Sequence, residues 1–213
     1  MADEVTHFYH VWADGAWSVP VREHFAALTE SGFPGHVHLG LVGTSDARAH
    51  AEARIRDLWA GEVSVCASAA AGFEQVTLAC VREHARAGRS RAILYAHTKG
   101  AYRTDPLSDV WRQDMTARVV AGWESALALL DEGRDAVGAH WLEPGTPSPD
   151  GQVTTDGPPF FAGNFWLASA AYLATLSEPG TASRYHAEGW IGTGNPRVHD
   201  LAPGWPVYDN AIN

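Results

Sequence analysis

Residues 91–100 read Arg-Ala-Ile-Leu-Tyr-Ala-His-Thr-Lys-Gly, and they decide the fold class of this chain. The apolar centre of Arg91–Ala96 is continuous, which is typical of a strand with both faces covered. Three polar residues, His97, Thr98 and Lys99, follow at once, and Gly100 ends the run. Open α/β sheets bind ligands beyond the carboxyl ends of their strands, so we expect a ligand site here.

The chain before this stretch alternates strand-like and helix-like segments. Residues with strand preference predict three earlier strands, at Val5–Trp12, His36–Gly43 and Glu62–Ala67. Apolar residues at helical spacing predict three helices: Val19–Ser31 after a Ser18 cap, a second that Ser45 caps and Gly61 ends, and Phe73–Ala87. This order predicts an α/β fold of Rossmann-like type, with a mostly parallel central sheet flanked by helices.

The pattern changes after the fourth strand. Ser108 opens a long helix whose apolar face runs from Trp111 to Leu130. We then expect strands at Ala136–Leu142 and Phe160–Trp166, a surface loop at Pro144–Pro159 between them, and a short helix at Ser169–Leu176. The whole reads as one domain over residues 1–194 with an irregular tail over 195–213.

The charge balance excludes one class of partner. Lys and Arg number 15 against 25 for Asp and Glu, which gives a formal net charge of −10. Binding of nucleic acid needs clustered positive charge, so we expect no nucleic-acid partner. The chain holds no run of about 18 apolar residues, so we expect no membrane span. Its first residues are acidic, so we also expect no signal peptide and a cytoplasmic location.

The cysteines and histidines form no recognisable metal motif. Cys66 and Cys80 cannot make a disulfide framework and match no zinc spacing, so we interpret them as small buried residues. Four of the eleven histidines lie on predicted strands, but no His-Glu-x-x-His occurs. The glycine motifs of dinucleotide-binding folds and P-loops, and the serine elbow of hydrolases, are absent as well.

Lys99 is the residue that points most directly to chemistry. It is the only lysine in a chain whose other 14 cations are arginines, and it follows a buried strand. We interpret it as a contact for a phosphate or a leaving group, against the alternative of an ordinary loop lysine beside a turn glycine. Arg112, early in the next helix, would add a second cation to an anion site.

Two later segments carry further candidates. The segment Phe160–Trp166 contains an amide, that of Asn164, close to a large ring, that of Trp166. The two would suit a sugar, because a sugar binds to a flat apolar face and to a hydrogen-bonding partner. Glu188 lies among apolar and aromatic residues, where burial would raise the pKa of its carboxyl toward that of a general base. The alternative for Glu188 is a salt-bridged structural carboxylate.

Short motifs in a fixed order also make the chain resemble a known group of proteins. These motifs are Phe8–Trp12, Phe73-Glu74, Ile93–Ala101, Trp111-Arg112 with Met115, Phe161–Trp166 and Glu188–Gly192. They resemble bacterial glycosyltransferase-like proteins related to the rhamnan synthesis protein F group, which share the GT-A fold. The resemblance extends from the first strand to Gly192.

The resemblance implies transfer of a sugar from a nucleotide-sugar donor to a glycan or small-molecule acceptor. It implies donor binding by Tyr9, His10, Trp12, Glu74, His97, Thr98, Lys99 and Arg112, and sugar or acceptor binding by Asn164, Trp166 and Trp190. Lys99 and Glu188 would be the catalytic residues, with Glu188 deprotonating the acceptor hydroxyl in an inverting displacement.

The chain departs from this group at one place. GT-A enzymes commonly carry an Asp-x-Asp after the fourth strand, where a divalent metal bridges the donor diphosphate. Here His97, Thr98 and Lys99 stand there, and no Asp-x-Asp occurs. A cation can stabilise a departing diphosphate, so we predict donor binding without a metal or other cofactor. Two alternatives stay open: a non-catalytic nucleotide- or carbohydrate-binding protein of this fold, and a metal-dependent hydrolase that uses the strand histidines.

Overall fold

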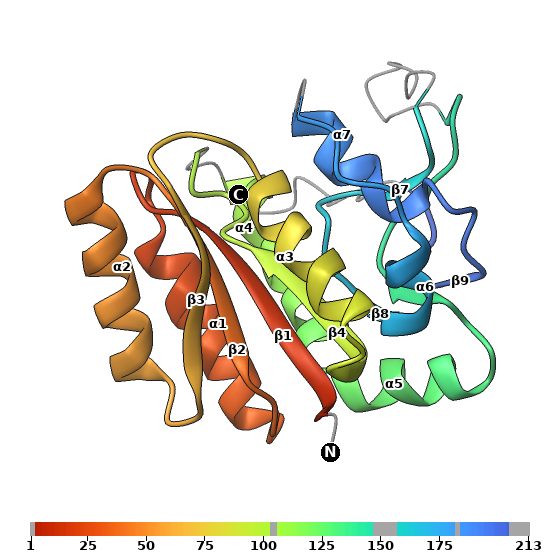
Figure 1. Cartoon of the computed structure of the whole chain (residues 1–213), viewed down its shortest axis with the longest axis horizontal. Coiled ribbons are helices and arrows are strands. Elements are labelled where there is room, and N and C mark those ends of the chain that lie inside the picture. The colour runs from red at the N-terminus through yellow and green to blue at the C-terminus, as the bar shows by residue number, and fades with distance from the viewer. Residues whose placement is uncertain (1–2, 103–105, 147–156, 182–183, 205–213) are drawn as a thin grey trace.

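The computed structural model describes residues 3–102, 106–146, 157–181 and 184–204. Its larger sheet is built from β1 (Asp3–Trp12), β2 (Val37–Val42), β3 (Val63–Ala69), β4 (Ser90–His97), β5 (Ala136–Gly138), β8 (Trp166–Ser169) and β9 (Val198–Asp200). Those seven strands lie in the order β3-β2-β1-β4-β8-β5-β9 (Figure 1). A separate two-stranded sheet pairs β6 (Trp141–Leu142) with β7 (Phe160–Phe161).

The strand directions confirm the fold class predicted from the sequence. β1 pairs in parallel with β2 and with β4, β2 pairs in parallel with β3, and β5 pairs in parallel with β9. β8 runs antiparallel to both of its neighbours, β4 and β5. The protein is therefore an α/β domain with a mostly parallel sheet.

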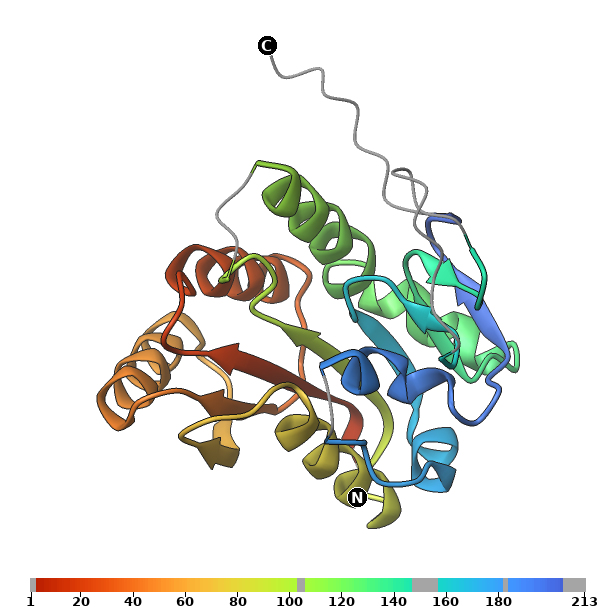
Figure 2. The same ribbon diagram turned by 90° about the horizontal axis from the view of Figure 1, so that it is seen from above.

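Helices cover both faces of the sheet. They are α1 (Ser18–Glu30), α2 (Ser45–Leu58), α3 (Gln75–Arg86), α4 (Pro106–Met115), α5 (Trp123–Asp131), α6 (Ala170–Thr175) and α7 (Arg184–Glu188). Figure 2 shows α1 and α4 on one side of the sheet and α3, α6 and α7 on the other. None of the helices in the described ranges combines the length and the apolar character that crossing a bilayer requires.

Two hydrophobic layers, one on each face, hold the helices on the sheet. One layer contains Phe25 and Leu28 of α1 and Ile55 of α2, and the other contains Leu78 and Val81 of α3. Side chains of a strand alternate between faces, so neighbouring residues of β1 belong to different layers. Phe8 packs in the layer of α3, and Tyr9 packs in the layer of α1.

Three predicted elements are interrupted in the structure. The long helix from Ser108 is broken between α4 and α5 by η1 (Thr116–Val120), a π-helical turn in which Ala121 N–H donates to Thr116 O. The strand at 136–142 divides because His140 has a φ of 61°, which no strand residue adopts. The strand at 160–166 divides at a turn where Gly163 and Asn164 have φ of 87° and 56°.

Smaller differences lie at the helix starts and in the tail. Trp17 and Thr44, rather than Ser18 and Ser45, hold the N-cap positions, and neither side chain makes a capping hydrogen bond. The predicted irregular tail contains β9, which extends the sheet by parallel pairing with β5. The strand is too short for its residues to show an alternating pattern. Residues 147–156 of the predicted loop and 205–213 of the tail lie outside the described residues.

Candidate active site

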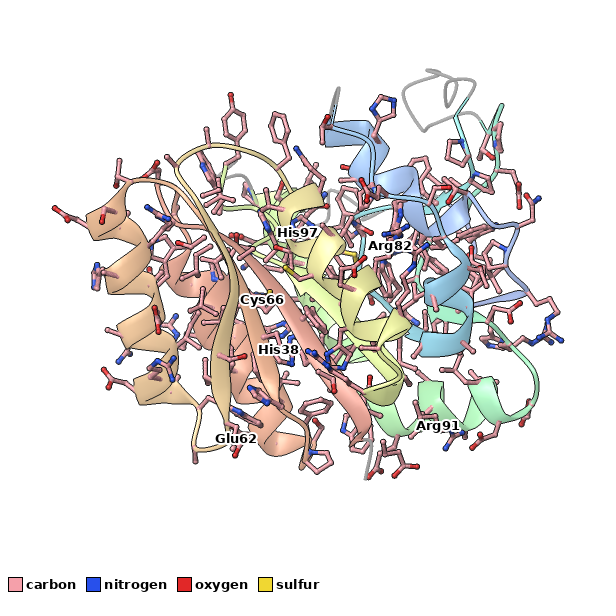
Figure 3. All side chains as sticks on the ribbon, viewed as in Figure 1. His38, Glu62, Cys66, Arg82, Arg91 and His97 are labelled. Carbon is pink, nitrogen blue, oxygen red and sulfur yellow. The ribbon has the colours of Figure 1, made fainter. Side chains whose placement is uncertain are left out.

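The predicted site loop lies at the carboxyl end of β4, as expected. His97, the last residue of β4, is the register partner of His10, which lies two residues before the end of β1. Thr98 ties the two strand ends together, because its backbone N–H donates to His10 O (2.9 Å) and its Oγ1 accepts from Trp12 N–H (3.0 Å). A third bond, from Ala16 N–H to Ala101 O (2.9 Å), joins the loops that follow β1 and β4. Figure 3 shows His97 toward this end of the strands and Glu62 toward the other.

His97 is bonded through both of its ring nitrogens. Nε2 lies 2.9 Å from Gly163 O, and Nδ1 lies 3.1 Å from a carboxylate oxygen of Glu74. A carbonyl oxygen can only accept, so Nε2 carries a hydrogen and Nδ1 faces the carboxylate. The ring of His97 thus links the Gly163 turn to the Glu74 carboxylate.

The surroundings disfavour a full charge on His97. The pKa of His97 is lowered to about 4, mainly by burial and to a smaller extent by the charge of Lys99. The hydrogen bond to Gly163 and the charge of Glu188 act in the opposite direction. The side chains of His97 and Glu74 are both only 15% exposed. A charged imidazolium is therefore disfavoured at this buried position.

Asn164 holds Glu74 in position. The indole N–H of Trp166 donates to Asn164 Oδ1 (2.8 Å), and an indole nitrogen can only donate, so the orientation of the amide is fixed. Nδ2 of Asn164 then donates to the second oxygen of Glu74 at 2.6 Å. Asn164 is 1% exposed and has both ends of its amide engaged. The amide thus supports Glu74 in this structure, and the contact of Asn164 with the sugar or acceptor stays a prediction.

Lys99 lies on the face of Trp111. Its Nζ is 3.5 Å from the centroid of the Trp111 ring, within the range of a cation–π contact. The ring in turn packs against the Gly163 turn: a Cβ added to Gly163 would lie 3.2 Å from Trp111 Cε2 and 2.5 Å from Met115 Sδ. The glycine is thus required both by its positive φ and by the closeness of these side chains.

Arg112 is buried among carboxylates. Its Nε donates to Glu23 (2.8 Å), its Nη1 donates to Asp109 (2.6 Å), and Nη1 also reaches Lys99 O (3.4 Å). Burial opposes the charge, but the bonds to the two carboxylates prevail and raise the pKa of Arg112. Two of its nitrogens are thus already paired and the side chain is 3% exposed, and the predicted contact of Arg112 with a phosphate stays a prediction. Arg112 positions the Lys99 loop.

Three predicted ligand contacts belong to the core instead. Tyr9, Trp166 and Trp190 are 1%, 0% and 2% exposed. Tyr9 stacks on His24, Trp166 stacks on Tyr95, and the indole N–H of Trp190 donates to Ser177 O (2.8 Å). The three side chains are thus part of the core in this structure, and their contact with a ligand stays a prediction.

His10 and Thr98 are also enclosed, and Trp12 is at the edge. His10 is 4% exposed and bonds to Thr77 Oγ1 (2.8 Å), while Thr98 is 5% exposed and makes the strand ties described above. Both side chains hold the strand ends together, and their assignment as donor contacts stays a prediction. Trp12 is only partly buried, and its ring is 5.4 Å from that of Tyr102, which is 77% exposed.

Glu188 lies near His97 at the end of α7. It is the last residue of α7 and the N-cap residue of η2 (Gly189–Gly192), and it is partly buried. Its charge raises the pKa of His97, which places the carboxylate within electrostatic reach of the ring. The arrangement brings together Glu74, the His97–Lys99 loop and Glu188 from three separate parts of the chain.

Sequence reasoning missed the partners of these residues. The Arg112–Asp109 pair has the i, i+3 spacing of helical neighbours and could have been found. Glu23 and Gly163 lie 89 and 66 residues from Arg112 and His97, and no local signal connects them.

A divalent metal does not fit the residues at the end of β4. Both nitrogens of His97 are engaged, and Lys99 adds a positive charge where a metal ion would stand. Across the described ranges, no group of three or more His, Cys, Asp or Glu side chains could hold a metal ion. Metal independence itself stays a prediction, to be tested by binding.

Comparison with known proteins gives a family and several distant structures. Residues 8–139 match the family described as "Domain of unknown function (DUF8361)", and the chain belongs to that family. No curated protein matches the sequence.

Solved structures match over most of the chain at low identity. Residues 1–349 of S. aureus TarS match with a TM-score of 0.49 and 10% identity, over 94% of this chain and 60% of that one. A second S. aureus TarS structure gives 0.48 and 10%, over 95% and 37% of the two chains. 4-Diphosphocytidyl-2C-methyl-D-erythritol synthase gives 0.42 and 14%, over 94% and 90%. The chain spans less than two thirds of either TarS structure.

Proposed function

We propose that this member of the DUF8361 family is a glycosyltransferase that moves a sugar from a nucleotide-sugar donor to an acceptor hydroxyl. The observation that carries the proposal is the position of Lys99, whose ammonium lies on the Trp111 ring just beyond the carboxyl end of β4. The ordered motifs that resemble bacterial glycosyltransferase-like proteins support the same reading. They include this loop and its aromatic partner.

The donor diphosphate would bind beside Lys99. An ammonium carries a positive charge and N–H donors, and both suit the oxygens of a diphosphate. Two neighbouring donors, Trp111 Nε1–H and Arg112 Nη2–H, are buried and have no hydrogen-bond partner within the described part of the chain. Burying an unpaired donor costs free energy, and an anionic oxygen beside Lys99 would offset that cost.

Transfer would then use Lys99 and Glu188 on opposite sides of the sugar. Glu188 accepts the proton of the acceptor hydroxyl while that oxygen bonds to the anomeric carbon. The bond between this carbon and the diphosphate oxygen breaks, and Lys99 stabilises the negative charge that forms on the leaving group. Attack opposite to the leaving group inverts the configuration. His97, through its contacts with Gly163 O and Glu74, holds the end of β4 and the Gly163 turn in place.

One observation favours a second candidate, a non-catalytic binding protein. Asn164, Trp166 and Trp190, the residues expected to grip the sugar or acceptor, are all enclosed in the structure. Such a protein would bind the nucleotide but would neither hydrolyse nor transfer the sugar.

The test is a thermal-shift and calorimetric screen of the purified protein. The probes are uridine, guanosine, thymidine and cytidine diphosphates and their sugars, each with chelator and with manganese. A ligand at a hundred times its Kd stabilises the fold by about 2.7 kcal/mol, which is roughly 5–11 °C for a domain of this size. The matched control is the uncharged nucleoside, which lacks the diphosphate and should bind much more weakly.

The outcomes separate the candidates. We expect a shift with one nucleotide series, the same shift in chelator, and release of the sugar on incubation with the bound donor. Glu188→Gln should retain binding and lose roughly 10²- to 10⁴-fold in turnover. Binding without hydrolysis or transfer would support the binding protein, and no shift with any of the compounds would refute the proposal.

A further inference from the structure

The two cysteines of the chain meet across the fold. Cys66 on β3 and Cys80 on α3 are reduced, partly buried and hydrogen-bonded to one another through their side chains. The thiol of Cys80 also lies 3.2 Å from the carbonyl oxygen of Cys66, and the thiol of Cys66 lies 3.3 Å from Leu39 O. The two cysteines, which the sequence predicts only as small buried residues, are therefore a contact pair.

Cys66 occupies an irregular place at the edge of the sheet. The pairing of β2 with β3 shifts between Leu39, which faces Val65, and Gly40, which faces Ala67. Cys66 is the extra residue of this bulge, outside the regular ladder of pairs. Because β3 is an edge strand, the bulge can adjust without disturbing a neighbour on its far side. Figure 3 shows Cys66 at mid-height of the sheet, between His97 and Glu62.

α3 is fixed above this bulge at a second point. Gly40 has no side chain where Thr77 of α3 approaches, and a Cβ there would overlap the Thr77 hydroxyl. The close approach sets the distance between α3 and the sheet, one turn before Cys80. The two sulfurs are thus held together by packing of the backbone as well as by their own contact.

We propose that Cys66 and Cys80 are a redox modification site, which a low-molecular-weight disulfide such as oxidised glutathione converts into an intramolecular disulfide. The thiolate of Cys80 attacks one sulfur of the small disulfide and releases one thiolate, leaving a mixed disulfide on Cys80. The thiolate of Cys66 then attacks Cys80 Sγ and releases the second. Two cysteine thiols are oxidised, the small disulfide is reduced to two thiols, and the cysteine protons end on those thiols.

The order of attack follows from the hydrogen bond between the thiols. The bond from Cys66 lowers the pKa of Cys80, against the effect of burial, whereas the bond to Cys80 and burial both raise the pKa of Cys66. A thiolate is the attacking species, so Cys80 reacts first and Cys66 resolves the mixed disulfide. This inference does not rest on the proposed function.

The experiment treats reduced, full-length protein with oxidised glutathione, blocks remaining thiols by alkylation and measures intact mass and melting temperature. Wild type should lose the mass of two hydrogen atoms and resist alkylation. The bond closes a loop of about 15 residues, which predicts a rise in Tm of roughly 6–12 °C that reductant reverses. Cys66→Ser should stop at a stable glutathione adduct on Cys80.

The same measurement can overturn the inference. Three results for wild type would show that the two thiols do not act as a pair. They are glutathione adducts only, covalent dimers, and a disulfide that forms solely after unfolding in urea. Cys80→Ser is the matched control, and it should react with glutathione far more slowly than Cys66→Ser. Equal adduct formation in the two variants would contradict the order of attack.

Discussion

Replacing Trp166 by phenylalanine removes one hydrogen bond from the interior and keeps an aromatic ring. Trp166 is 0% exposed, its ring stacks on Tyr95 at 4.9 Å, and its N–H is the donor to Asn164 Oδ1. The phenylalanine variant leaves that oxygen buried without its donor, which costs about 1–3 kcal/mol. Alanine removes the ring as well, and loss of a buried large aromatic costs roughly 3–5 kcal/mol before the hydrogen bond is counted.

The assay is urea unfolding followed by circular dichroism, with Trp141→Phe as the matched control. The N–H of Trp141 donates to Glu143 (2.7 Å) at an exposed site, so water can replace the lost bond. We expect the control to change the free energy of unfolding by no more than about 0.5 kcal/mol. Equal, small effects of Trp166→Phe and Trp141→Phe would refute the assignment of Trp166 to the core and would return it to the surface of the site.

Two further predictions concern the fold around the site. Gly40→Ala should lower the free energy of unfolding by about 1–3 kcal/mol, because the new methyl group overlaps Thr77. Urea unfolding measures this free energy, and a change near zero would contradict the close approach of Thr77 to Gly40. Burial lowers the pKa of His7 to about 4 and that of His10 to about 3, from 6.5. The unfolded chain thus binds more protons as the pH falls below 6.5, and stability should fall by roughly 2 kcal/mol per histidine between about pH 7 and pH 5. Unchanged urea midpoints across that range would be inconsistent with buried neutral histidines.

The alternation of strands and helices could be predicted because its signals are local. β1 to β4 and α1 to α3 each carry their own periodicity, and the rule for open sheets then places residues 97–100 at a site. The interruptions could not be predicted in the same way. The breaks at η1, His140 and the Gly163 turn depend on how distant elements pack, and β9 is recognisable only by its pairing with β5.

Side-chain roles were less predictable than elements. The residue type of Trp166 suits a sugar platform and a core equally well, and only burial decides between them. The Glu74–Asn164 bond joins residues 90 apart, so the amide could not be assigned from its own segment. Lys99 could be singled out as a candidate because its signal is compositional: it is one lysine at the end of a buried strand.

The central claim is that Lys99 binds the diphosphate of the donor, and calorimetry tests it most directly. The ligand that gives the largest thermal shift is titrated into wild type, Lys99→Ala, Lys99→Arg and Arg54→Ala, which removes an exposed cation on α2. A hydrogen bond to a charged group contributes about 1.5–3 kcal/mol, so Lys99→Ala should weaken Kd by roughly 10- to 100-fold. Lys99→Arg should fall between, and Arg54→Ala should match wild type. The same Kd in wild type and Lys99→Ala would contradict the claim.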